Sequence, residues 1–149
     1  MKKISLLFVF ATSILLMSNC TFNSTYINRE EDNREGEEFV NKFYKNVASK
    51  NLTALDTMVS DTLKKIAGPD GISKLITLIN TKVGDYKTDS IADHYVTRTT
   101  GSNNFTSYNY KVKVTYSKGV VDEIIGLRKM DNGQVKLTSY HANSDLLIK

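Results

Sequence analysis

The chain has 149 residues and a formal net charge of +4, with 40% hydrophobic and 24% charged side chains. This length suits one domain, and the hydrophobic content is enough for a core and excludes a disordered chain. From Cys20 onward the chain holds 18 basic and 16 acidic side chains, a net charge of +2 that excludes a basic nucleic-acid-binding domain.

The first residues form a basic segment followed by an apolar run. Lys2 and Lys3 precede the uncharged stretch 4–16, whose thirteen residues match the length of a signal-peptide core and are few for a membrane-spanning helix. Soon after this stretch comes Cys20, the only cysteine, which has no second cysteine with which to form an intramolecular disulfide. The pattern predicts export, with residues 1–19 as a cleaved signal.

Residues 1–20 resemble a bacterial lipoprotein signal, with Leu16 and Ser18 as the aliphatic and small residues before the cysteine. The resemblance implies a diacylglycerol on the thiol of Cys20, cleavage before this residue, and acyl chains that hold the protein on a cell-envelope membrane. Thr21 is not the acidic residue that retains some lipoproteins at the inner membrane, so we expect the outer membrane in a cell that has one. An ordinary secretory signal or an uncleaved anchor is the alternative.

The stretch that follows the cysteine is polar and acidic. Residues 20–38 carry two basic and six acidic side chains, and Gly36 lies near the end of the stretch. This composition predicts a flexible acidic tether over 20–36, between the lipidated cysteine and a single domain that covers 37–149. An acidic docking segment is the alternative interpretation.

Apolar residues at helical spacing predict three helices in the next part of the chain. The first covers roughly 33–49, and Asn51 can cap a short second helix. Residues 61–66 form a further turn before the glycine and proline break at 68–71, and the third helix then runs to a stop at Gly84. The apolar stripes of the first and third helices are Phe39, Val40, Phe43, Tyr44, Val47, Ile72, Leu75, Ile76, Ile79 and Val83.

After Gly84 the period of the apolar residues drops to two, which is typical of strands with one buried and one solvent-facing side. The clearest case is 108–116, where tyrosine and valine alternate with polar residues. Helices followed by meandering strands predict an α+β fold, an antiparallel sheet of about four strands with the helices on one face. The expected strands cover 86–99, 108–116, 120–129 and 135–143.

This order of elements, over roughly 37–147, resembles the cone-shaped fold of the nuclear-transport-factor-2-like superfamily. The aromatic opening at 39–44 (FVNKFY) and the segment 51–55 (NLTAL) are similar to small exported members of unassigned function. The resemblance implies that the helical unit lies in the concave side of a curved sheet. A cystatin-like fold is the alternative. The superfamily includes enzymes, ligand binders and assembly modules, so the fold alone does not select a function.

Tyrosines are the most distinctive candidates for a binding site. Three share one face of the 108–116 strand, a fourth lies on a later strand, and each ring carries a hydroxyl at its tip. Two histidines join them if their faces also point into the cone, and the set could enclose a small apolar or aromatic ligand. The alternative is that the rings pack under the helices as core. The candidate pocket residues are Tyr108, Tyr110, Tyr116, Tyr140, His94 and His141.

No motif predicts a catalytic residue, a metal site or a cofactor. The sequence has no nucleophile elbow, phosphate loop or dinucleotide fingerprint, and the histidines lack the spacing of a metal-ligand pair. Asp122 and Glu123 are adjacent and point to opposite faces of a strand, so one of them could face the interior as a single general base. His94 or His141, paired with Asp93 or Asp122, is the other acid–base alternative.

Three functions from different classes fit these patterns. The first is a non-catalytic module of the cell envelope that binds a small ligand or an envelope protein, or that forms a homodimer through its sheet. The second is a small cone-fold enzyme that uses a single acid or histidine. The third is an immunity or inhibitor lipoprotein with a tight protein partner. Of these, the sequence favours the first, because it fits the membrane anchor and the lack of a catalytic motif.

Overall fold

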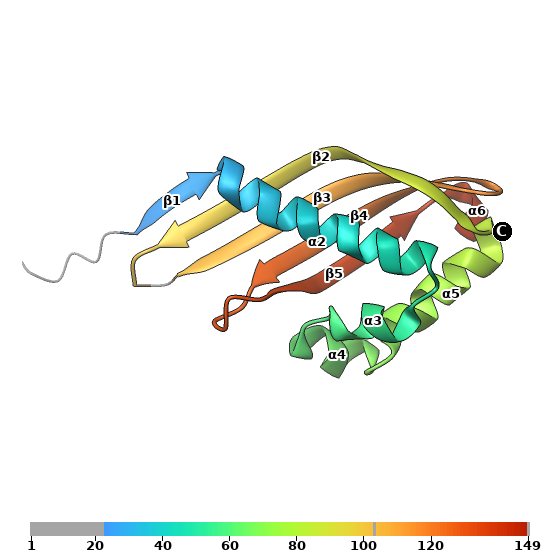
Figure 1. Cartoon of the computed structure of the whole chain (residues 1–149), viewed down its shortest axis with the longest axis horizontal. Coiled ribbons are helices and arrows are strands. Elements are labelled where there is room, and N and C mark those ends of the chain that lie inside the picture. Colours follow the sequence, from blue (N-terminus) through green and yellow to red (C-terminus); the bar gives the residue numbers. More distant parts are fainter. Residues whose placement is uncertain (1–22, 103, 149) are drawn as a thin grey trace, which may run out of the picture.

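The computed structural model describes residues 23–102 and 104–148, so Cys20 and the predicted signal lie outside the described residues. In this part the chain forms an antiparallel sheet with N-terminal helices packed on it, which confirms the predicted α+β fold class (Figure 1). The elements are β1 (Ser24–Ile27), α2 (Glu30–Ala48), α3 (Leu52–Thr57), α4 (Asp61–Ala67), α5 (Gly71–Val83), β2 (Tyr86–Thr100), β3 (Phe105–Tyr116), β4 (Gly119–Lys129), β5 (Val135–Asn143) and α6 (Asp145–Ile148).

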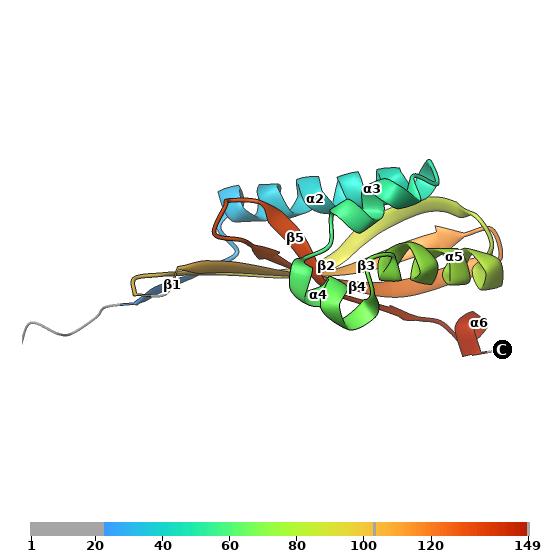
Figure 2. The same ribbon diagram turned by 90° about the horizontal axis from the view of Figure 1, so that it is seen from below.

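The sheet is a five-stranded meander in the order β1-β2-β3-β4-β5. Its long strands curve, and α2 lies along the concave side (Figures 1 and 2). α3 follows α2 closely, α5 packs against α3, and α4 contacts β5, so the shorter helices gather at the β5 side of the sheet. This arrangement is consistent with the cone of the nuclear-transport-factor-2-like superfamily.

The predicted flexible tether is wrong for residues 24–36. Ser24–Ile27 pair with the end of β2, and α2 begins at Glu30. All four residues of β1 are exposed, so this strand has no apolar alternation by which a sequence pattern could reveal it. All six acidic residues belong to α2, and three of them lie in its first turn, where the helix dipole favours negative charge. The sheet therefore has five strands where about four were expected.

The core lies between α2 and the concave side of the sheet. The apolar stripe predicted for the first helix is buried, and β3 turns alternate side chains toward it, as the predicted period of two requires. Each large side chain that is fully buried stabilises the fold by about 2 kcal/mol. The facing residues are Phe39, Val40, Phe43, Tyr44 and Val47 of α2 and Tyr108, Tyr110, Val112, Val114 and Tyr116 of β3.

The shorter helices begin and end at the residues that the sequence indicates. Asn51 caps α3, because its Oδ1 accepts a hydrogen bond from the backbone N–H of Ala54 at 3.2 Å. Ser60 caps α4 in the same way, through the N–H of Leu63 at 3.3 Å. α5 ends at Gly84, whose φ of +85° is in the left-handed region. The predicted cap and the predicted stop are both confirmed.

The segment between α3 and α4 covers part of the edge of β5. The N–H of Ser60 donates to the carbonyl oxygen of Leu137 at 2.9 Å, and the N–H of Leu137 donates to the carbonyl oxygen of Met58 at 2.9 Å. These bonds pair edge groups that would otherwise offer a template to another strand. They also hold α4 beside the hairpin that joins β4 to β5.

Candidate functional site

A buried carboxylate lies on the concave side of the sheet. Glu123 of β4 is 1% exposed, and both of its carboxylate oxygens accept hydrogen bonds. The Tyr44 hydroxyl, from α2, donates to Oε2 at 2.7 Å, and the Tyr116 hydroxyl, from β3, donates to Oε1 at 2.8 Å. One acidic group thus links the helix to two strands of the sheet.

Further aromatic rings surround this carboxylate. Tyr44 and Tyr86 stack with ring centroids 6.0 Å apart, and Tyr86 meets Tyr116 edge to face at 6.3 Å. The Tyr86 hydroxyl donates to Asp89, and these two half-buried residues form the side of the group nearest to solvent. We call the whole set the tyrosine–carboxylate cluster. Its members are Tyr44, Tyr86, Asp89, Tyr116, Glu123 and Tyr140.

Burial sets the electrostatics of the cluster. It raises the pKa of Glu123 above the ordinary value of 4.5, against the opposing effect of the tyrosine hydroxyls, and the nearby Asp89 raises it further. Burial also raises the pKa of Tyr140, and the negative charge of the nearby Glu123 raises it further. No lysine, arginine or histidine in residues 23–102 and 104–148 forms an ion pair with Glu123. The site therefore stabilises the protonated form of the Glu123 carboxyl more than water does.

The raised pKa of Glu123 predicts how stability depends on pH. A proton binds this group more tightly in the folded chain than in the unfolded chain, so ionisation opposes folding. The stability that the neutral carboxyl provides is fully present below pH 4.5 and is lost as the pH rises through the folded-state pKa. We expect the free energy of unfolding of the wild type to fall relative to that of Glu123→Gln over this rise. Denaturant unfolding of both chains across the pH range checks this, and parallel pH profiles would contradict it.

Two of the predicted pocket tyrosines are core residues held to α2. Tyr108 is 2% exposed and its hydroxyl donates to Glu35 at 2.6 Å, while Tyr110 is 0% exposed and donates to the carbonyl oxygen of Asn33 at 2.9 Å. Gly36 of α2 lies directly over both rings. Helix α2 fills the space in front of these rings. The other two predicted tyrosines, Tyr116 and Tyr140, belong to the tyrosine–carboxylate cluster.

The two candidate histidines lie on opposite faces of the sheet. His94 is half-buried on the concave side, where its ring stacks on Tyr110 with centroids 5.9 Å apart. His141 is exposed and pairs with Ile124 on the convex side, so the prediction that both histidines line one pocket is wrong. A register shift beside Leu127 inserts one extra residue in β5 after Leu137. From there on, each β5 side chain points to the opposite face from the one that simple alternation predicts.

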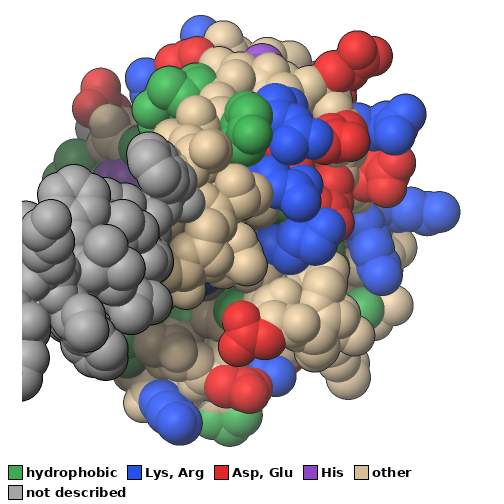
Figure 3. Space-filling model, turned by 90° about the vertical axis from the view of Figure 1, so that its left-hand side faces the viewer, with side chains coloured by type: hydrophobic (Ala, Val, Ile, Leu, Met, Phe, Trp, Pro, Cys, Tyr) green, Lys and Arg blue, Asp and Glu red, His purple; other side chains and the backbone are tan. Residues whose placement is uncertain are grey.

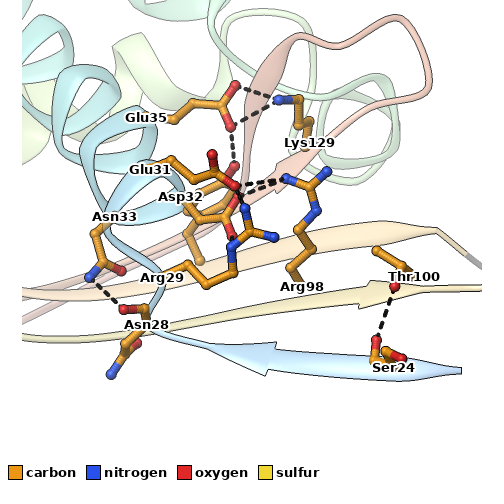
Figure 4. A network of polar contacts seen from close by, with 11 residues as sticks. Ser24, Asn28, Arg29, Glu31, Asp32, Asn33, Glu35, Arg98, Thr100 and Lys129 are labelled. Atoms are coloured by element: carbon orange, nitrogen blue, oxygen red, sulfur yellow. Dashed lines mark hydrogen bonds and ion pairs between the residues drawn. The ribbon is translucent and has the colours of Figure 1, made fainter.

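An ion-pair network fixes the start of α2 to the sheet (Figure 4). Arg98 of β2 bonds Asp32 at 3.1 Å, and Lys129 of β4 bonds Glu35 at 2.8 Å. Asp32 is buried and also pairs with Arg29 at 3.5 Å. Burial pushes the pKa of Glu35 upward, but hydrogen bonds from Lys129 and Tyr108 outweigh it and leave that pKa below its ordinary value. The network positions α2 over the concave side.

A groove of about 880 Å³ lies outside the filled interior, between α4 and the β4–β5 hairpin. Val59, Leu127 and Met130 give it apolar lining, and cations outnumber acids around them. An apolar lining with charged surroundings is typical of surfaces that bind protein segments. The charged lining residues are Lys64, Arg128, Lys129, Lys136, Asp61 and Asp131.

The sequence predictions missed how the tyrosine–carboxylate cluster comes together. Glu123 shares strand parity with Val121 and Ile125, both fully buried, so this parity marks it as the inward member of the acidic pair. Tyr44 belongs to the predicted stripe of the first helix. Its contact with Glu123 joins positions 79 residues apart in the chain, and no local pattern indicates such a contact.

No protein-family model matches this chain, and a search of curated proteins finds no similar protein. Among the residues that the structure describes, no helix is both long enough and apolar enough to cross a membrane. Within the same residues, no three side chains of the His, Cys, Asp or Glu type converge as ligands for a metal ion. The sequence of this chain and the geometry of its described residues are therefore the basis for a functional proposal.

Proposed function

We propose that the chain is a bacterial lipoprotein whose domain is a non-catalytic binding module of the cell envelope. The anchor is lipid on Cys20, and this part of the proposal depends on the resemblance of residues 1–20 to a lipoprotein signal. Two or three acyl chains hold a protein on a membrane almost permanently. With Thr21 after the cysteine, the outer membrane is the proposed location in a cell that has one.

The observation that carries the binding role is the filled concave side of the domain. Helix α2 packs onto the inward tyrosines of β3, and Tyr44 and Tyr116 occupy both oxygens of the inward Glu123. A partner therefore meets the outer surface, and the 880 Å³ groove beside α4 has the volume and the mixed lining to receive a protein segment. The proposed partner is an envelope protein. If the chain is an immunity or inhibitor lipoprotein, this partner is the protein that it inhibits.

Site-specific photo-crosslinking in cells that make the full chain tests this role. A photoreactive amino acid at Thr62 or Asn132, both exposed in the groove, is expected to give one discrete adduct of higher mass. The matched control is the same amino acid at Thr81, which is exposed on α5 away from the groove. Adducts of the same mass and yield from all three positions, or none from the groove, would contradict a partner there.

An enzyme that uses Glu123 as its single acid–base group is the second candidate. The raised pKa of this buried carboxyl favours it, since catalytic groups are often perturbed in this way. Substrate access would require α2 to move, because Tyr44 covers the carboxylate. Glu123→Gln separates the two functions. A binding module keeps its groove adducts in this variant, whereas an enzyme keeps its substrate affinity and loses turnover.

A further inference from the structure

Pairing of β1 with β2 restricts how far the domain can move relative to the start of the chain, which a flexible tether would not do. β1 pairs with the last residues of β2 through four residue pairs. Immediately before it, Asn23 Oδ1 accepts hydrogen bonds from the backbone N–H and the hydroxyl of Ser102, at 3.0 and 3.1 Å. The chain is thus fixed to the turn between β2 and β3 from residue 23 onward.

The distance from this turn to the proposed anchor is short. Asn23 is the third residue after Cys20, and three steps of extended chain span at most about 10 Å. If the lipid is on Cys20, as the proposed function holds, the end of the domain that contains this turn lies against the bilayer. The opposite end, where β3 turns into β4, then points away from it.

Side chains at this end suit the surface of a bilayer. Tyr26 and Ile27 of β1 are 44% and 55% exposed. The guanidinium of Arg128 lies 5.5 Å from the centroid of the Phe105 ring and forms no ion pair in the described part of the chain. Tyrosine rings sit well at the level of lipid headgroups, and cations are attracted to anionic phosphates.

A hollow of about 320 Å³ lies at this end, between the β2–β3 hairpin and the β4–β5 hairpin. Phe105 and Met130 line it together with Arg98 and Lys129, whose charges are shared with acids of α2. Figure 3 views the molecule from this end, where Lys and Arg side chains gather beside acidic ones. Apolar, aromatic and cationic groups therefore occur together on the side nearest to the anchor.

We propose that this end is a membrane-contacting surface, with the phospholipid headgroups of the anchoring bilayer as its partner. Tyr26 and Ile27 enter the interfacial layer, and Arg128, which also lines the 880 Å³ groove, lies at the level of the phosphates on the bilayer side of that groove. The inference rests on the proposed anchor. Contact with the bilayer fixes the orientation of the domain. The end with the β3–β4 turn, together with α5, then faces away from the bilayer into the aqueous space beside it.

Tryptophan fluorescence tests this contact sharply, because the chain contains no tryptophan. Tyr26→Trp places a reporter on the proposed surface, and Val120→Trp places one at the far end, with similar exposures of 44% and 46% for the native residues. These positions lie about 30 Å apart along the sheet, by the rise of nine strand residues. The full, lipid-modified variants are placed in vesicles of phosphatidylethanolamine and phosphatidylglycerol with brominated acyl chains.

We expect the emission of Tyr26→Trp to shift to shorter wavelength and to be quenched about twofold or more by the brominated lipid, while Val120→Trp is unaffected. Equal quenching of both reporters, or quenching of neither, would overturn the inference. Intact mass of the same samples separates this outcome from failure of the anchor. Acyl chains on the protein with an unquenched Tyr26→Trp reject the surface alone, and a chain without acyl mass rejects both proposals.

Discussion

Glu123→Ala is expected to lower the free energy of unfolding by about 3 kcal/mol. The substitution removes the only acceptor in the described chain for the buried hydroxyls of Tyr44 and Tyr116, and it leaves space where the carboxyl packed. A buried donor without a partner costs about 1–3 kcal/mol. Denaturant unfolding below pH 4.5 is the measurement, because the wild-type carboxyl is then neutral and the comparison omits its ionisation.

Two variants make this prediction specific. Glu123→Gln keeps the volume and a carbonyl acceptor, so we expect a loss of about 1 kcal/mol or less under the same conditions. Asp122→Ala removes the adjacent, exposed carboxylate on the convex side and is expected to change stability by about 0.5 kcal/mol or less. An equal loss in Glu123→Ala and Asp122→Ala would contradict a structural role for the tyrosine–carboxylate cluster.

Gly36→Ala is expected to destabilise the protein, opposite in sign to what helix propensity alone predicts. Alanine is favoured over glycine inside a helix by about 1 kcal/mol. At this position, however, a Cβ atom would lie 2.8 Å from ring carbons of Tyr108 and Tyr110, which are buried and cannot move aside. We expect a net loss of about 1–3 kcal/mol from this overpacking.

The control for this prediction is Glu38→Ala, an exposed position two residues further along α2. It changes a surface side chain without a new contact, so we expect almost no change in stability. Thermal or denaturant unfolding of the two variants gives the comparison. A Gly36→Ala chain that is more stable than the wild type would show that α2 does not press on the tyrosines of β3.

The fold could be predicted wherever one side of an element is buried along its whole length. The stripe from Phe39 to Val47 and the alternation from Tyr108 to Tyr116 each record a burial pattern, and the structure confirms both. β1 could not be predicted in this way, because all four of its residues are exposed and only its pairing with β2 makes it a strand. The acids that suggested a tether belong to the first half of helix α2.

The candidate site was less predictable than the fold. Parity along β4 can assign Glu123 to the interior, but the two tyrosines that bind it come from α2 and β3, and only tertiary packing brings them together. On β5 the register shift near Leu137 moves Tyr140 inward and His141 outward, so simple alternation gives the wrong face. When a bulge or a contact with a distant residue sets the position of a site residue, the periodicity of the sequence does not reveal that position.

The membrane anchor is the central claim, and intact mass spectrometry of the protein extracted from washed membranes tests it most directly. We expect a chain that begins at Cys20 and carries a diacylglycerol with a further acyl chain, and we expect Cys20→Ser to be unprocessed or released from the membrane. Thr21→Ser, which leaves the cysteine intact, should behave as the wild type. A membrane-bound protein that begins at another residue, or whose Cys20 thiol carries no lipid, would contradict the account.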